Sequence, residues 1–272
     1  MTADQGQQTS LVINESVRLE RDGALGWVVL TRPEQINAIN DAIRAGVPQA
    51  LAMLDRDPQV RIILIRGEGE RGFCAGADIK EKRGEESSLQ TRQRMERNRW
   101  IESLDSIGKP VIAAIHGYCM GGGMELALAC DIRFAAPSAV FALPETGLGL
   151  IPGGGGTQRL SRVVSPGLAM DMLLTGERMN AEEARRVGLA TRLGSSDDAW
   201  LEEVSTFARN IAAKPPAASA YAKQAARAAL ELDLKRGLDL ELDLFALLAP
   251  TKDRREAALA FAERREPRFT GE

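Results

Sequence analysis

The sequence is poor in histidine, cysteine and lysine. Its only histidine is His116 and its three cysteines form no Cys-x-x-Cys pair, which argues against a zinc site. Only seven of its 35 basic residues are lysines, and those 35 nearly balance 38 acidic residues. So small a net charge provides no field that would gather nucleic acid or an anionic membrane surface. We therefore expect neither as a partner.

The sequence also lacks a long apolar run and a targeting segment. No stretch approaches the roughly 18 consecutive apolar residues that a membrane helix needs. Residues 1–10 are polar, without the apolar centre of a signal peptide or the arginines of an organelle-targeting peptide. We therefore expect a cytoplasmic protein with a flexible N-terminus over residues 1–12. Its cysteines, Cys74, Cys119 and Cys130, are expected to be reduced thiols.

Short apolar runs alternate with helical patterns in the first half of the chain. With 272 residues, 44% of them hydrophobic, the chain can bury a core as one large domain. A helix is predicted over residues 41–55. Strands are predicted at residues 24–30, 60–65, 111–115, 132–135 and 139–142. This alternation predicts an α/β layer fold with a buried sheet.

The second half reads as helix after helix from about residue 157. Asn180 and Glu183 have the spacing of a capping box, and Pro215-Pro216 separates two alanine-rich helices. Residues 230–248 carry leucines on more than one side, so this helix needs cover from its own domain or from another subunit. We therefore divide the chain into a core over residues 13–200 and a helical C-terminal region over residues 201–272.

Three glycine-rich turns, at residues 73–80, 116–125 and 143–159, carry the candidate chemistry. In the second, an apolar strand runs into three glycines and then into a helix with Glu125 in its first turn. The first amides of a helix have no intrahelical acceptor and lie at the positive end of its dipole, which suits an anion or a developing oxyanion. A tight strand-to-helix crossing without a ligand fits the same glycines, so both interpretations stay open here.

Glu145 lies at the start of the third turn. Taken alone, it favours a surface charge over a group aimed into a site. The turn continues as Gly147-Leu-Gly149, but Pro152 occupies the place of the third glycine of a dinucleotide-binding motif. No segment has the Gly-x-x-x-x-Gly-Lys-Ser/Thr pattern of a P-loop. The turn therefore argues against nucleotide binding.

Together these segments resemble the enoyl-CoA hydratase/isomerase (crotonase) family. The resemblance covers roughly residues 14–270. It rests on several motifs in order: Ala75-Gly-Ala-Asp78, Gly121-Gly-Gly-Met-Glu125, Cys130-Asp-Ile132, Leu143-Pro-Glu145, Ile151-Pro152 and Gly156-Thr-Gln-Arg159. It implies an α/β fold built as a crotonase-like spiral of β-β-α units in two sheets. It also implies that the helical C-terminal region serves oligomerisation, giving a homotrimer or a homohexamer.

The resemblance further implies an acyl-CoA thioester substrate, with its carbonyl held by the backbone amides of Ala77 and Gly122. Coenzyme A then enters as part of the substrate, and no metal or other cofactor is implied. Gly153 is expected to open another helix, whose N-terminus would hold the water or Glu145. The remaining substrate contacts are expected from Ala75, Asp78, Ile79 and Lys80.

Glu125 and Glu145 stand 20 positions apart, as in family members that carry two catalytic glutamates. The resemblance assigns proton exchange at the α-carbon to Glu145 and activation of water to Glu125, so that a 2-enoyl thioester becomes a 3-hydroxyacyl-CoA. Isomerisation, dehydration of a specialised 3-hydroxyacyl-CoA and non-catalytic binding of acyl-CoA or RNA stay open as alternatives. So do the acyl chain and the pathway, whether fatty-acid β-oxidation or another breakdown route. His116 is expected to be structural.

Overall fold

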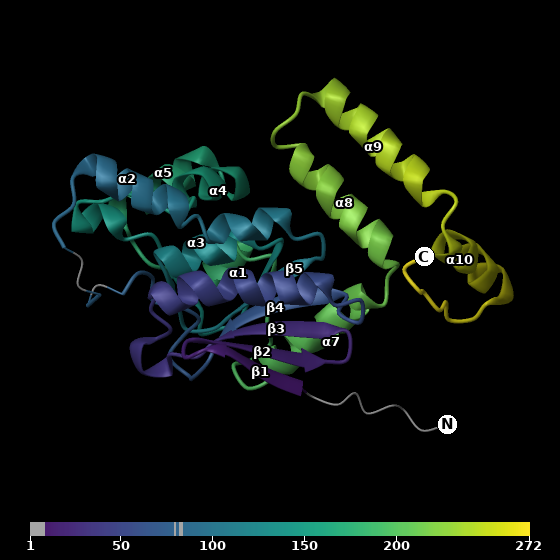
Figure 1. Ribbon diagram of the computed structural model, residues 1–272, viewed down its shortest axis with the longest axis horizontal. Helices are drawn as coiled ribbons and strands as arrows, with labels where there is room; N and C mark the ends of the chain where they lie inside the picture. Colours follow the sequence, from purple (N-terminus) through teal and green to yellow (C-terminus); the bar gives the residue numbers. More distant parts are fainter. Residues whose placement is uncertain (1–8, 79, 82–83) are drawn as a thin grey trace.

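The computed structural model describes residues 9–78, 80–81 and 84–272. Its strands are β1 Thr9–Asn14, β2 Val17–Asp22, β3 Leu25–Leu30, β4 Ile62–Gly67, β5 Val111–Ile115, β6 Tyr118–Met120, β7 Ile132–Ala135, β8 Val140–Ala142, β9 Met179–Asn180 and β10 Arg192–Leu193. Within these residues they form two sheets. One has the order β1-β2-β3-β4-β5-β7-β10 and the other β6-β8-β9 (Figure 1).

Helices surround the larger sheet and continue beyond it. They are α1 Asp41–Arg56, α2 Ser88–Arg97, α3 Gly122–Ala129, α4 Gly156–Val163, α5 Pro166–Thr175, α6 Ala181–Arg186, α7 Trp200–Ala212, α8 Pro216–Ala228, α9 Leu234–Leu248 and α10 Lys252–Glu263. Three short 3-10 helices join them: η1 Pro33–Gln35, η2 Ile101–Ser106 and η3 Glu145–Leu148. The predicted α/β fold is confirmed.

The middle of the large sheet is parallel and covered on both faces. Strands β3, β4, β5 and β7 pair in parallel, and every residue of β3 and β5 is buried. Alternate residues of β4 pack into two separate clusters: Ile63 joins the cluster that includes α1, and Leu64 joins the one that includes Trp200 of α7. Because both faces are covered, these strands read as continuous apolar runs.

Most predicted elements lie where the pattern placed them. β5 and β7 have the predicted bounds, and β3, β4 and β8 begin one or two residues later. Asn180 does cap α6, where its side chain accepts a hydrogen bond from the Glu183 amide at 2.8 Å. The Glu183 carboxylate, however, binds Arg186, so only one half of the predicted capping box is recorded among the described residues. Of the expected flexible N-terminus, residues 1–8 lie outside the described residues and residues 9–12 belong to β1.

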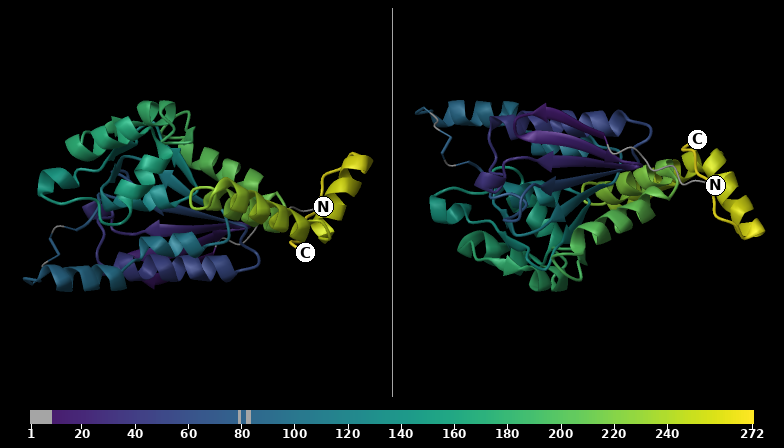
Figure 2. Two further views of the ribbon diagram at one scale, coloured as in Figure 1. Left: turned by 90° about the horizontal axis from the view of Figure 1, so that it is seen from above. Right: turned by 90° about the horizontal axis from the view of Figure 1, so that it is seen from below.

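Helices α8, α9 and α10 extend away from the sheets as an arm (Figures 1 and 2). Pro215 and Pro216 mark the break between α7 and α8, as predicted. The arm buries little of its own apolar surface, because Leu244 is the single buried residue of α9. Large exposed apolar side chains line the arm: Leu234, Leu238, Leu242, Phe245, Leu247, Leu259 and Phe261. Within the described residues, none of the helices combines the length and the apolar character needed to cross a membrane.

Candidate active site

The three glycine-rich turns meet at the N-terminus of α3. The first turn pairs with β6, because the Cys74 amide donates to the Tyr118 carbonyl at 3.0 Å and the Cys74 carbonyl accepts from Met120 at 2.9 Å. Gly76 has φ +91°, and a side chain there would lie 3.0 Å from the Met120 carbonyl oxygen. Glycine is therefore required for the two loops to approach so closely.

Glu125 lies in the first turn of α3 and is only 5% exposed. Its Oε1 accepts hydrogen bonds from the amides of Gly154 at 2.7 Å and Gly156 at 2.8 Å. Gly156 is the first residue of α4, so the positive end of that helix dipole faces the carboxylate. Burial raises the pKa of Glu125 above its usual range, while the two amides and the positive charge of Arg159 offset part of the rise.

Glu145 begins η3 and lies close to the same loops. A Cβ added to Gly121 would be 3.0 Å from its Oε1. Its Oε2 is buried and has no hydrogen-bond partner among the described residues. Burial raises the pKa of Glu145, its own backbone amide opposes that rise, and the negative charge of Glu125 adds to it. The two glutamates are thus close enough for the charge of one to act on the other.

The amides of Ala77 and Gly122 are neighbours beside this pair. A Cβ built on Gly122 would lie 3.8 Å from the Ala77 nitrogen and 3.9 Å from Oε2 of Glu125. Gly122 is the first residue of α3, where an N–H has no intrahelical acceptor. Across the described residues, no turn, loop or cap acceptor takes up either N–H. Two open donors therefore lie near a buried carboxylate.

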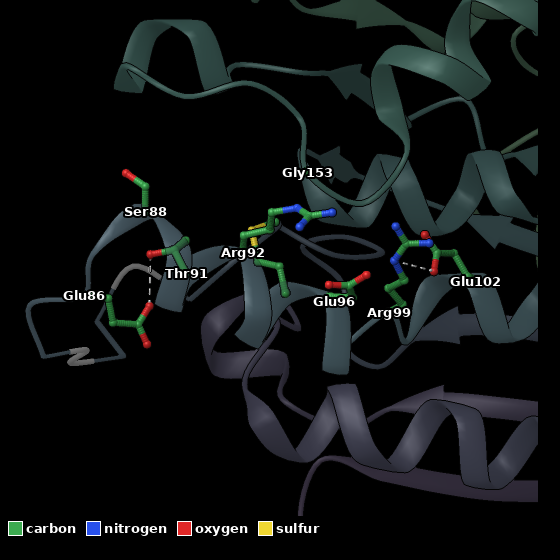
Figure 3. A pocket seen from close by; sticks show the side chains of 9 residues that line it. Glu86, Ser88, Thr91, Arg92, Glu96, Arg99, Glu102 and Gly153 are labelled. Carbon is green, nitrogen blue, oxygen red and sulfur yellow. Dashed lines mark hydrogen bonds and ion pairs between the residues drawn. The ribbon is translucent and has the colours of Figure 1, made fainter.

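A cavity of about 520 Å³ adjoins this region and is lined by one face of α2 together with Glu102 and Gly153 (Figure 3). Figure 3 shows the side chain of Arg92 extending toward the loop that carries Gly153, and Arg99 paired with Glu102. A Cβ on Gly153 would lie 2.8 Å from the end of Met95. The next residue, Gly154, donates its amide to Glu125, so a residue that lines the cavity directly precedes one that holds the carboxylate.

Comparison with known proteins identifies the family. The family model described as enoyl-CoA hydratase/isomerase matches residues 20–272. The chain belongs to the enoyl-CoA hydratase/isomerase family. Among its relatives, the crotonyl-CoA hydratase of Syntrophomonas wolfei is 38% identical, over 94% of this chain and 98% of the relative. The mitochondrial enoyl-CoA hydratase of Pongo abelii is 41% identical, over 92% of this chain and 84% of the relative.

Solved structures of enoyl-CoA hydratases share the fold. The crystal structure of the enoyl-CoA hydratase from Bacillus anthracis superposes with a TM-score of 0.89 at 36% identity, covering 94% of this chain and all of the other. One from Geobacillus kaustophilus gives a TM-score of 0.88 at 37% identity, over 94% and 98% of the two chains. The predicted family and the predicted crotonase-like fold are both confirmed.

The remaining residues expected to bind substrate differ in their hydrogen bonds and exposure. The Ala75 amide donates to the Ile36 carbonyl at 2.9 Å. Asp78 binds Arg32 at 2.9 Å and accepts from the Lys80 amide at 3.0 Å, and the hydrogen bond from Arg32 lowers the pKa of Asp78. Asp78 therefore holds its own loop together, while Lys80 is exposed. Ile79 lies outside the described residues.

The prediction that Gly153 opens a helix is wrong. Helix α4 begins at Gly156, and its N-cap Gly155 has a left-handed backbone with φ +104°. Four successive glycines offer no side chain to fix the start of the helix. The sequence pattern therefore does not determine which of residues 153–156 is the first helical residue. The amides of Gly154 and Gly156 at this turn bind Glu125, and a water held at this terminus stays a prediction.

His116 and the cysteines lie in buried surroundings. The His116 ring stacks on Trp200 with centroids 5.3 Å apart, and its Nε2 lies 2.7 Å from the Gly69 carbonyl oxygen. Burial lowers the pKa of His116, which favours the neutral ring. All three cysteines are free and buried, and burial raises the pKa of Cys74 and Cys130 to about 12. Such thiols are poor nucleophiles because little thiolate forms.

Two features of the site were missed from the sequence. Arg159 was noted only as the last letter of a motif, yet its charge acts on Glu125. The second is the helical conformation of α2, which lines the cavity: none of its ten residues is buried, so its sequence carried no apolar stripe that would have identified a helix. The periodicity of buried residues is the signal that places a helix, and α2 lacks it.

Proposed function

We propose that this protein is an enoyl-CoA hydratase that adds water reversibly to a 2-enoyl-CoA thioester and forms a 3-hydroxyacyl-CoA. The observation that carries the proposal is the juxtaposition of Glu125 and Glu145, both of raised pKa, with the open amides of Ala77 and Gly122. The names of the relatives agree with it, since several are hydratases of 2-enoyl thioesters.

The two amides would act as an oxyanion hole. Addition of water at the β-carbon places negative charge on the thioester oxygen, and fixed N–H donors stabilise that charge without reorganising. The Gly122 amide adds the positive end of the α3 dipole. A Cβ on Gly122 would lie 2.8 Å from Cδ1 of Ile39, so a larger residue there would require Ile39 to shift. Backbone donors at such a point let the thioester come close.

The surroundings of the two carboxylates support separate roles. Glu125 accepts two N–H groups and has Arg159 nearby, which favours the ionised form that can accept a proton from water. Among the described residues, Oε2 of Glu145 is buried and has no hydrogen-bond partner, and the negative charge of Glu125 lies beside it; both favour the protonated form. We therefore assign activation of water to Glu125 and proton exchange at the α-carbon to Glu145.

Hydration forms a C–O bond at the β-carbon and a C–H bond at the α-carbon without net oxidation or reduction, so the proposed mechanism uses the two carboxylates and needs no redox cofactor. Coenzyme A would arrive as part of the substrate. Gly153, Ala75, Asp78, Ile79 and Lys80 are proposed to line its path. We further propose that the reaction serves the breakdown of acyl chains, as in fatty-acid β-oxidation, in a reducing compartment such as the cytoplasm, where three buried thiols would stay free.

The test is the loss of conjugated enoyl-thioester absorbance with crotonyl-CoA. The wild-type protein should remove it rapidly, and Glu125→Gln and Glu145→Gln should both nearly abolish the reaction while keeping the circular dichroism of the wild type. Unchanged hydration in either variant would remove that residue from the chemistry. A folded wild-type protein that turns over 3-enoyl thioesters but leaves crotonyl-CoA untouched would establish the isomerase alternative.

We also propose that the arm mediates assembly into a homotrimer or a homohexamer. Its exposed leucines and phenylalanines form apolar surface of a kind that soluble chains normally cover. Sedimentation should therefore give three or six chains per particle. A double change of Leu242→Glu and Phe245→Glu should shift the particle toward the monomer, with Glu241→Gln on the same helix as the control. A wild-type monomer would contradict this proposal.

A further inference from the structure

The turn that holds Glu125 has little stiffness of its own. It consists of four successive glycines, residues 153–156, and glycine loses more conformational freedom on folding than any other residue. Yet the Gly154 and Gly156 amides both reach Oε1 of Glu125 within 2.8 Å. Something outside the glycine run must therefore restrain this turn.

Arg159 supplies a restraint from one turn further along α4. Its amide donates to the Gly155 carbonyl at 2.8 Å, and its Nε would lie 3.1 Å from a Cβ on Gly155. The side chain therefore folds back over the turn. Its guanidinium then binds Asp105 of η2 at 2.6 Å, and the Arg159 side chain is only 23% exposed. The glycine turn is in this way covered on one side by an arginine anchored to another element.

Asp105 is itself held by the C-terminal arm. Arg227 of α8 lies 3.4 Å from the other oxygen of Asp105 and forms a closer ion pair with Asp131, at 2.8 Å. It also donates to the Ala129 carbonyl at 3.0 Å, at the last residue of α3, the helix that carries Glu125 at its other end. Arg227 thus links the arm to α3 directly and to α4 through Asp105 and Arg159.

We propose that Arg159 is a positioning residue for Glu125, anchored by Asp105. The proposal rests on the proposed function only in giving Glu125 a catalytic task. Among the described residues, the charged groups whose charge acts on Glu125 are Arg159 from α4 and Glu145 from η3. Arg159 is the cation of the set, so its removal changes both the restraint and the electrostatics of the carboxylate.

The first measurement needs no substrate. Carboxyl carbons of glutamate are labelled with ¹³C, and the resonance of Glu125 is assigned as the one missing from Glu125→Gln. Because the positive charge of Arg159 lowers the pKa of Glu125, Arg159→Gln should move its titration to higher pH. Arg159→Lys should restore most of the wild-type titration. Arg162→Gln, the same charge change on the same helix, should leave it unmoved.

The second measurement is the pH dependence of kcat/KM with crotonyl-CoA. The ionised form of Glu125 would then require higher pH, so the acid limb should move upward in Arg159→Gln. We expect kcat at the optimum to fall on the order of tenfold, less than the roughly 10²-fold that a 1 Å misplacement can cost. Asp105→Asn, which keeps Arg159 but removes its anchor, should give a smaller change in the same direction.

The outcomes separate the two proposals. An unmoved Glu125 titration and an unmoved acid limb in a folded Arg159→Gln protein, with Asp105→Asn also unchanged, would overturn the positioning role and leave the hydratase intact. A shifted Glu125 titration in a protein that hydrates no 2-enoyl thioester would keep the positioning role and overturn the proposed function. If Arg162→Gln shifted the Glu125 titration and the acid limb as much as Arg159→Gln does, the effect would come from the loss of a positive charge anywhere on α4. That result would also overturn the positioning role.

Discussion

The two carboxylates of the site occupy contrasting surroundings. Around Glu125, two backbone N–H groups, a helix N-terminus and Arg159 all favour negative charge. Around Glu145, one buried oxygen has no partner among the described residues, and the nearby charge is negative. Burial raises the pKa of both; two amides and the positive charge of Arg159 offset the rise for Glu125, whereas for Glu145 its own backbone amide opposes the rise and the charge of Glu125 adds to it. The difference teaches that one residue type can serve as base or as acid according to its neighbours.

The largest expected effect comes from replacing Glu145, the carboxyl with fewer hydrogen-bond donors around it. Glu145→Gln removes the proposed proton donor to the α-carbon, and general acid–base contributions are typically about 10²–10⁴-fold in rate. We expect kcat for crotonyl-CoA hydration to fall within that range with little change in substrate binding. Stopped-flow absorbance measures the rate, and calorimetric titration with a saturated acyl-CoA measures the binding. A fall in binding without a fall in kcat would assign Glu145 to substrate contact instead.

The backbone support of Glu125 can be tested by crowding it. A Cβ in Gly154→Ala would lie 2.8 Å from Oε2 of Glu125 and 2.7 Å from Ile101. The carboxylate or the loop must shift, and we expect kcat to fall by up to about 10²-fold, as for a 1 Å misplacement. Gly147→Ala, where the added Cβ meets nothing within 4 Å, is the matched control. Equal activity of the two variants would mean that the position of Glu125 is not held by this turn.

The different protonation states proposed for Glu125 and Glu145 should also produce two limbs in the pH profile of kcat/KM. For hydration, Glu125 has to be ionised, so kcat/KM should fall as pH drops through the pKa of Glu125. Glu145 has to be protonated, so kcat/KM should fall as pH rises through the pKa of Glu145. Both pKa values are raised, so both limbs should lie above the range of ordinary carboxyls. Because the groups interact, the limbs report the pair as a whole. A profile that stays flat into alkaline solution would exclude Glu145 as the proton donor.

The smallest expected effect is on stability. A carboxyl whose pKa is raised in the folded state stabilises the fold at pH below its unfolded pKa, and this contribution is lost as pH rises through the folded pKa. At neutral to alkaline pH, Glu145→Gln should therefore unfold at slightly higher urea than the wild type. The gain should stay below the roughly 1–3 kcal/mol that a fully buried unsatisfied group costs. The gain should shrink in acid, and a gain that is equal at all pH values would contradict the raised pKa.

The parts of the fold that follow from local pattern were predictable. Strands such as Val111–Ile115 are short apolar runs bounded by Pro110 and Gly117, so pattern alone sets their limits. The start of α4 was not predictable in the same way, because four glycines provide neither a cap nor a periodic apolar face. Helix α2 escaped prediction for a related reason, since none of its residues is buried.

The amino-acid sequence by itself determined the family, the alternation of strands and helices, and the glycine positions at which the loops can approach each other. It also supplied the two glutamates in recognisable motifs. Only the tertiary structure decided which helix terminus supports Glu125, that Oε2 of Glu145 has no hydrogen-bond partner in the described part of the chain, and that Arg159, Asp105 and Arg227 join the arm to the site. The physical reason is range: pattern reflects neighbours along the chain, whereas a pKa and an ion pair depend on groups that folding brings together from distant positions.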